Sequence, residues 1–171
     1  MITLLDYGAG NVRSVINAIE KLGETVRVAQ DGQGILAAEK LVFPGVGNFG
    51  NMIHILKQKQ YMDPLRIYLQ SNRPFLGICL GLHALFEESE EAPELKGLGV
   101  LKGCARRFRV KRSVPHIGWN GIKVKQPSIL FNDIQGNEKF YFVHSYYVDP
   151  KDASVVMTTT DYGIEFVSGI Q

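Results

Sequence analysis

The chain has 171 residues, of which 45% are hydrophobic and 21% charged, as in a soluble globular protein large enough for one core. Nineteen basic and 17 acidic residues leave a net charge of +2, which is too small to indicate a nucleic-acid partner despite a basic stretch at residues 102–112. Two cysteines cannot form a disulfide framework, and the longest apolar-rich run, residues 75–86, is too short for a bilayer, so we expect a cytoplasmic protein without membrane segments.

The first half of the sequence alternates strand and helix patterns. Strands are expected at 2–5, 25–29, 41–43 and 75–78. Helices are expected over 12–22, around 52–56, from an Asp63 cap onward and over 82–86. Short apolar strands separated by helices predict an α/β fold with a mostly parallel sheet covered on both faces.

The second half changes to short strands and turns. Strands are expected at 99–101, 106–110, 122–124, 140–144, 154–159 and 164–167. They are typical of late hairpins, and no linker or repeat interrupts them, which favours one domain over residues 1–171. The acidic run at 87–94 is interpreted as a solvated loop.

The most informative segment is Gly77-Ile78-Cys79-Leu80-Gly81, which joins an apolar strand to a helix. With serine in place of cysteine, this strand–turn–helix pattern is a nucleophile elbow, in which glycines permit a sharp turn that exposes the side chain. A helix N-terminus favours the thiolate, and the N–H of Leu80 points to where an oxyanion forms. The alternative is a buried core cysteine, but the two glycines favour the elbow.

A second glycine-rich loop, Pro44-Gly45-Val46-Gly47, leaves the carboxyl end of another expected strand. Ligands bind at that edge of open α/β sheets, and free N–H groups of this loop would complete an oxyanion hole. A plain turn is the alternative. Neither a metal nor a cofactor is expected, because no Cys/His cluster has ligand spacing and the turn at Gly8 lacks a nucleotide-binding pattern.

Five motifs in order resemble the glutaminase component of imidazole glycerol phosphate synthase, a class I glutamine amidotransferase. Besides the two loops above they are Tyr7-Gly8-Ala9-Gly10-Asn11, Pro115-His116-Ile117-Gly118-Trp119-Asn120 and Tyr141-Phe142-Val143-His144-Ser145-Tyr146. The resemblance implies a flavodoxin-like fold and glutamine hydrolysis through a thioester on Cys79. It also implies ammonia transfer to a (β/α)8-barrel cyclase, either a separate subunit or a fused domain.

The same resemblance implies roles for individual residues. Val46, Gly47 and Leu80 would form the oxyanion hole. His144, Ser145 and Tyr146 would line the glutamine pocket, and Asn11 and Trp119 would face the cyclase. His83 stands where the family commonly has a glutamine that helps to bind substrate, so we interpret it as a pocket residue.

The sequence departs from the family pattern in one respect. The family supplies its base and the carboxylate that orients it from a late His-Pro-Glu segment, which these 171 residues do not contain. About two dozen further residues, with a last strand and helix, are expected from the resemblance. His144 is the best alternative base by position, but a pocket-wall role is favoured. We therefore expect negligible glutaminase activity from the chain alone.

Two alternative functions remain open at this point. One is a non-catalytic subunit that docks on the cyclase and regulates it. The other is a glutaminase that serves a different amino-acceptor enzyme.

Overall fold

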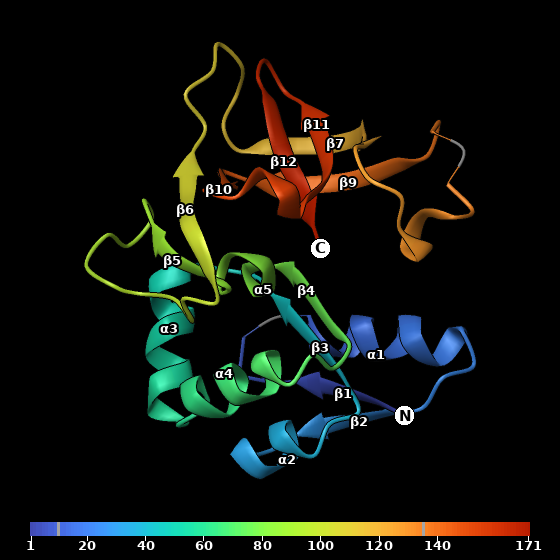
Figure 1. Ribbon diagram of the computed structural model, residues 1–171, viewed down its shortest axis with the longest axis vertical. Coiled ribbons are helices and arrows are strands. Elements are labelled where there is room, and N and C mark those ends of the chain that lie inside the picture. Colours follow the sequence, from blue (N-terminus) through green and yellow to red (C-terminus); the bar gives the residue numbers. More distant parts are fainter. Residues whose placement is uncertain (10, 135) are drawn as a thin grey trace. The chain divides into compact units, whose positions relative to one another are not determined.

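The computed structural model of the protein describes residues 1–9, 11–134 and 136–171 (Figure 1). The chain divides into two compact units, Met1–Leu101 and Lys102–Gln171, and each is described by itself. Gly10 of the first glycine-rich turn lies outside the described residues.

The first unit is built on a parallel sheet of four strands in the order β2-β1-β3-β4. Its strands are β1 (Ile2–Leu5), β2 (Val26–Ala29), β3 (Lys40–Gly45) and β4 (Phe75–Cys79). Parallel neighbours require a crossover between them, which the intervening helices provide. Leu4, Leu5 and Phe43 are fully buried, as expected for strands covered on both faces. The predicted α/β class is confirmed.

The described residues of this unit form the helices α1 (Val12–Lys21), α2 (Gly32–Leu36), α3 (Phe49–Gln58), α4 (Met62–Gln70) and α5 (Leu80–His83). The side chain of Asn48 caps α3 by accepting a hydrogen bond from the N–H of Asn51 at 3.1 Å. The prediction of Asp63 as the cap of α4 is wrong. The helix begins one residue earlier, and Asp63 lies in its first turn.

The helix after Cys79 ends at His83, before the Leu85 and Phe86 that were predicted to belong to it, and the chain then forms strand β5 (Phe86–Ser89). The carbonyl groups of Ala84 and Leu85 accept hydrogen bonds from the N–H groups of Leu98 (2.7 Å) and Leu101 (2.9 Å). These carbonyls would be needed for a longer helix, so the returning chain ends it. The prediction of a solvated loop at 87–94 is also wrong. Residues 87–89 belong to β5, and Ser89 and Ala92 are buried.

The second unit is antiparallel. Five of its strands lie in the order β6-β10-β12-β11-β8, and β7 pairs with β9 in a separate ribbon. The strands are β6 (Leu101–Arg107), β7 (His116–Gly121), β8 (Lys123–Val124), β9 (Lys139–His144), β10 (Tyr146–Pro150), β11 (Val156–Asp161) and β12 (Glu165–Ile170). The two strands predicted at 99–101 and 106–110 are one strand, β6, while β7 and β10 were not predicted.

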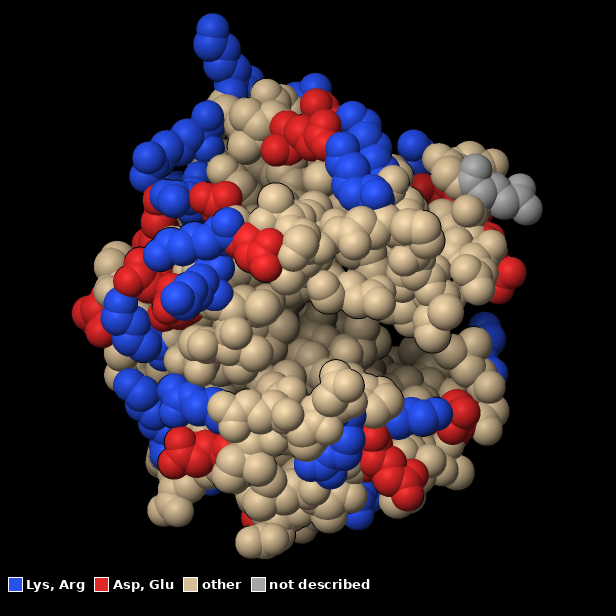
Figure 2. Space-filling view, viewed as in Figure 1, with Lys and Arg blue, Asp and Glu red and all other residues tan. Residues whose placement is uncertain are grey.

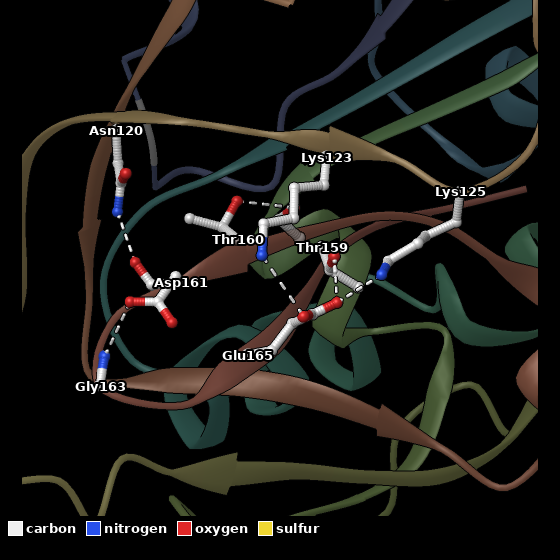
Figure 3. A network of polar contacts seen from close by, with 9 residues as sticks. Asn120, Lys123, Lys125, Thr159, Thr160, Asp161, Gly163 and Glu165 are labelled. Atoms are coloured by element: carbon white, nitrogen blue, oxygen red, sulfur yellow. Dashed lines mark hydrogen bonds and ion pairs between the residues drawn. The ribbon is translucent and has the colours of Figure 1, made fainter.

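A network of ion pairs ties three strands of this unit together (Figure 3). The carboxylate of Glu165 on β12 contacts the ammonium groups of Lys123 and Lys125 and accepts a hydrogen bond from the hydroxyl of Thr159. The hydrogen bonds from Lys125 and Thr159 are the main reason that the pKa of Glu165 is lowered to about 2. This network therefore joins β11 and β12 to the segment that contains β8.

Charged side chains of both signs are interspersed on the face of the molecule shown in Figure 2. In the basic stretch of β6, for example, Arg106 forms an ion pair with Asp149 of β10. Among the described residues, no helix combines the length and the apolar character needed to span a membrane.

Candidate active site

Cys79 lies at the junction of β4 and α5, in a backbone conformation that side chains rarely adopt. Its φ of +55° and ψ of −111° place it outside the regions favoured by residues with a Cβ atom. Such strain is characteristic of nucleophile elbows, where the sharp bend projects the reactive side chain. Cys79 is exposed to solvent, so it is not a buried core cysteine.

The two glycines around Cys79 are required by close backbone contacts. A Cβ atom on Gly81 would lie 1.9 Å from the carbonyl oxygen of Phe43, and one on Gly77 would lie 2.6 Å from the carbonyl oxygen of Gly81. Neither carbonyl group can move aside without displacing the packed backbone to which it belongs. The Gly-x-Cys-x-Gly pattern thus lets α5 start directly against β3 and β4.

The second glycine-rich loop lies beside the elbow. Within the parallel pair β3–β4, Gly45 is opposite Cys79, so both strands end at the same edge of the sheet. A Cβ atom on Gly45 would lie only 2.6 Å from the Cβ of Leu80. Val46 and Gly47 are exposed, and the φ of Gly47 is +104°. The structure therefore places the predicted oxyanion loop next to the exposed thiol.

Three influences set the acidity of the thiol. Desolvation by the surrounding protein raises the pKa of Cys79, the backbone N–H of Leu80 lowers it, and the negative charge of Glu91 raises it. The first effect is the largest even though the residue is exposed, and the net direction is upward. The expected stabilisation of the thiolate by a helix N-terminus is therefore outweighed, in part because α5 has only four residues. The thiol needs help to lose its proton.

Glu91 is a residue of this site that the sequence did not identify. One of its carboxylate oxygens accepts a hydrogen bond of 2.8 Å from the N–H of Phe49, at the start of α3. Because the two residues are 42 positions apart, no local pattern indicates this contact. Glu91 therefore links the acidic segment to the helix that follows the oxyanion loop, and it brings negative charge toward Cys79.

His83 occupies α5, four residues after Cys79, and is buried. Residues four apart share one side of a helix, but Cys79 precedes α5 and has a non-helical backbone conformation, so the helical spacing does not apply to this pair. The role of His83 in the substrate pocket stays a prediction.

In the second unit, His144 belongs to a directed chain of hydrogen bonds. Its Nδ1 lies 2.8 Å from the carbonyl oxygen of Tyr146, and its Nε2 lies 3.0 Å from Nδ1 of His116. A carbonyl only accepts, so Nδ1 of His144 donates, and its Nε2 accepts from His116. The remaining nitrogen of His116 faces the side-chain amide of Asn120 at 3.5 Å. Each imidazole in this chain is neutral.

The surroundings of the two histidines stabilise that neutral state. Burial is the main cause that lowers the pKa of His144 to about 4, and burial also lowers the pKa of His116. The ring of His116 stacks between Phe142 and Tyr162, with centroid distances of 4.9 and 3.9 Å. Both ring nitrogens of His144 are engaged, which supports a structural role for this residue and not a role as base.

The other predicted residues are placed as follows. Ser145, between β9 and β10, and Tyr146, the first residue of β10, are half-buried, and the carbonyl of Ser145 accepts a hydrogen bond from the N–H of Phe108 at 3.0 Å. Asn11 is exposed at the N-cap of α1, and Trp119 is exposed on β7. The described residues include no group of three His, Cys, Asp or Glu side chains that could hold a metal ion.

Comparisons with known proteins agree with this arrangement. The family model described as Glutamine amidotransferase class-I matches residues 3–170. The chain is 46% identical over 169 residues to imidazole glycerol phosphate synthase subunit HisH 1 of Methanococcus maripaludis, covering 97% of this chain and 83% of that protein. It is 44% identical over 177 residues to subunit HisH of Syntrophotalea carbinolica, covering 99% and 86%. A crystal structure of a glutamine amidotransferase is similar in fold, with a TM-score of 0.67 at 18% identity over 95% of this chain and 85% of that one.

Proposed function

The chain belongs to the class I glutamine amidotransferase family, among the HisH subunits of imidazole glycerol phosphate synthase, and we propose from this premise that Cys79 hydrolyses glutamine. The observation that carries the proposal is the exposed thiol on a strained bend, with the N–H of Leu80 directed at its sulfur and the loop at 44–47 beside it. The family model covers both units, which supports treating residues 1–171 as parts of one amidotransferase domain.

The chemistry follows from these groups. The sulfur of Cys79 attacks the side-chain carbonyl carbon of glutamine, and the electron pair of the C=O bond moves to oxygen. The N–H of Leu80 and those of Val46 and Gly47 stabilise this oxyanion. When the oxyanion collapses, the C–N bond breaks and nitrogen leaves as ammonia after taking a proton. Water then hydrolyses the thioester, which releases glutamate and restores the thiol.

The proton transfers are not assigned to a residue of this chain. His-Pro-Glu, which supplies them in the family that the sequence resembles, does not occur in the 171 residues, and His144 is engaged at both nitrogens. The pocket roles of His83, His144, Ser145 and Tyr146 remain part of the proposal, supported by their place in the matching motifs.

We propose that the ammonia passes to a (β/α)8-barrel cyclase that forms imidazole glycerol phosphate; the proposal is supported by relatives that are named as subunits of imidazole glycerol phosphate synthase. The β7–β9 ribbon supports a docking role, because one of its faces consists of exposed apolar side chains. Ile117 is paired with Val143, and Trp119 with Tyr141, at exposed fractions of 58%, 61%, 70% and 56%. Apolar patches of this kind mark protein interfaces. Asn11 is proposed to contribute from α1.

A thiol-directed glutamine analogue tests the catalytic proposal. A diazoketone analogue of glutamine should label Cys79, as located by peptide mass spectrometry, and excess glutamine should protect it. The matched control is Cys104→Ser, which should label as fast as the wild type because Cys104 lies in β6. Labelling that falls on Cys104 alone would show that the elbow does not bind glutamine.

The docking proposal is tested on the complex with the cyclase. Trp119→Ala should weaken binding by at least about 30-fold, the loss expected for a central aromatic anchor. Leu22→Ala, which removes an exposed apolar side chain from the C-cap of α1, should leave affinity nearly unchanged. Equal affinities for Trp119→Ala and the wild type would exclude the β7–β9 face as the interface.

A non-catalytic docking subunit is the second candidate function, favoured by the exposed apolar ribbon. Cys79→Ala separates the two, because it abolishes glutamine-dependent turnover of the complex if the chain is a glutaminase and leaves a purely regulatory effect intact. A glutaminase for a different acceptor enzyme would be revealed by failure to bind the cyclase. We further propose a cytoplasmic location, which is supported by two cysteines that form no disulfide bond.

A further inference from the structure

The hydroxyl group of Tyr7 lies at the base of the oxyanion loop. Tyr7 follows β1, its side chain is 1% exposed, and its ring packs edge-on against Phe43 with centroids 5.6 Å apart. The hydroxyl donates a hydrogen bond of 3.3 Å to the carbonyl oxygen of Val46. A Cβ atom on Gly45 would lie 3.2 Å from the same hydroxyl. Tyr7 therefore contacts the loop from the core side of the sheet.

This contact fixes one particular peptide group. In a trans peptide the C=O of Val46 and the N–H of Gly47 point in opposite directions. The Tyr7 hydroxyl holds the carbonyl toward the core, so the N–H is turned away from the core. Gly47 is exposed and has a φ of +104°, where glycine has unusual freedom. Without the bond, this peptide would be free to rotate.

We propose that Tyr7 is a positioning residue of the oxyanion hole, which holds the Val46–Gly47 peptide so that its N–H serves the substrate oxygen beside Cys79. This inference rests on the proposed glutaminase function and assigns a role to a residue outside the loop and the elbow. The residue touches neither substrate nor sulfur in this role and acts through the loop.

The electrostatics of Tyr7 fit a permanent donor. Burial raises its pKa to about 12, and the charge of Cys79 acts in the same direction. The hydroxyl thus keeps its proton throughout the pH range in which a cysteine is titrated.

A buried tyrosine hydroxyl needs a partner in any case, so the test must separate positioning from stability. Two reactions of Cys79 do so. The γ-(4-nitrophenyl) ester of glutamate is attacked at its carbonyl carbon; a C–S bond forms, the C–O bond breaks, and 4-nitrophenolate leaves with the electron pair. This acylation passes through an oxyanion and needs no acid. Iodoacetamide reacts with the same sulfur by displacement of iodide, without an oxyanion.

Tyr7→Phe removes the hydroxyl and keeps the ring against Phe43. We expect it to slow acylation about two- to tenfold, the range of one hydrogen bond, and to leave the alkylation rate unchanged. The matched control is Tyr68→Phe, because the buried Tyr68 hydroxyl donates to the carbonyl of Pro74 at 2.7 Å, outside the loop. It should change neither rate. Circular dichroism establishes that each variant is folded, and 4-fluorophenylalanine at position 7 replaces phenylalanine if Tyr7→Phe is insoluble.

The outcomes are distinct. Acylation of Tyr7→Phe at the wild-type rate, or an equal fall of both rates, overturns the positioning role while the glutaminase proposal stands. A fall in the acylation rate relative to the alkylation rate in Tyr68→Phe would also overturn the positioning role, because the effect would then not be specific to Tyr7. If wild-type acylation is no faster than that of Cys79→Ala, both proposals fail together. A fall in acylation alone, confined to position 7, establishes the role.

Discussion

The paired histidines His116 and His144 should make the second unit less stable as the pH falls into the mildly acidic range. An imidazole with a folded pKa below its unfolded value binds fewer protons when folded, so stability is present above the unfolded pKa and is lost as pH falls. For His144 the pKa falls from 6.5 to about 4. Between about pH 7 and about pH 4.5 this difference removes roughly 2.5 kcal/mol of unfolding free energy, and His116 acts in the same direction.

The measurement is urea unfolding at both pH values, followed by the fluorescence of the only tryptophan, Trp119, which lies on the same ribbon. The variant His144→Asn keeps a donor toward the carbonyl of Tyr146 but no longer titrates in this range. It should be less stable than the wild type near pH 7, and the gap should close by roughly 2.5 kcal/mol near pH 4.5. A gap that stays constant, with unchanged denaturant slopes, would show that His144 is not held neutral.

Two further predictions concern the elbow. Gly81→Ala should destabilise the first unit by about 3 kcal/mol or more in thermal unfolding, because its Cβ would lie 1.9 Å from the carbonyl oxygen of Phe43. The control is Gly34→Ala, whose Cβ would make only ordinary contacts, and it should change stability by less than about 1 kcal/mol. Similar losses of stability in both variants would contradict the packing argument. Glu91→Gln keeps an acceptor for the N–H of Phe49 and removes a charge that raises the pKa of Cys79. Alkylation of Cys79 by iodoacetamide should therefore become faster at pH values below the thiol pKa. An unchanged dependence of the alkylation rate on pH would mean that the charge of Glu91 does not influence the sulfur.

The sequence predicted those parts of the fold whose cause is local. The strands β1, β2, β3 and β4 are short apolar runs between turns, and a buried parallel strand needs no other signal. Likewise, the glycines beside Cys79 indicate the elbow. The contact that excludes a side chain at Gly77 lies within the same strand–turn–helix, whereas the one at Gly81 is made with Phe43 of β3. The loop at 44–47 lies beside Cys79 because β3 and β4 are neighbouring parallel strands whose carboxyl ends share one edge of the sheet.

The features that the sequence did not predict depend on distant partners. The helix at Leu80 is short because Leu98 and Leu101 take the carbonyl groups needed to extend it. The strand β7 contains two glycines and an asparagine, which are uncommon in strands, and it is extended because β9 pairs with it. Glu91 was placed in a solvated run because nothing in its neighbourhood indicates the N–H of Phe49 as its partner.

The histidine pair also decides which side of the β7–β9 ribbon faces outward. His116 and His144 are directly opposite each other, on the face away from Trp119 and Tyr141. Sliding one strand by a single residue would exchange its two faces. One imidazole would then lose its partner, and an aromatic ring would turn inward in its place. The hydrogen bond between the two imidazoles therefore helps to fix the register of β7 against β9, and with it the side of the ribbon on which Trp119 and Tyr141 are exposed.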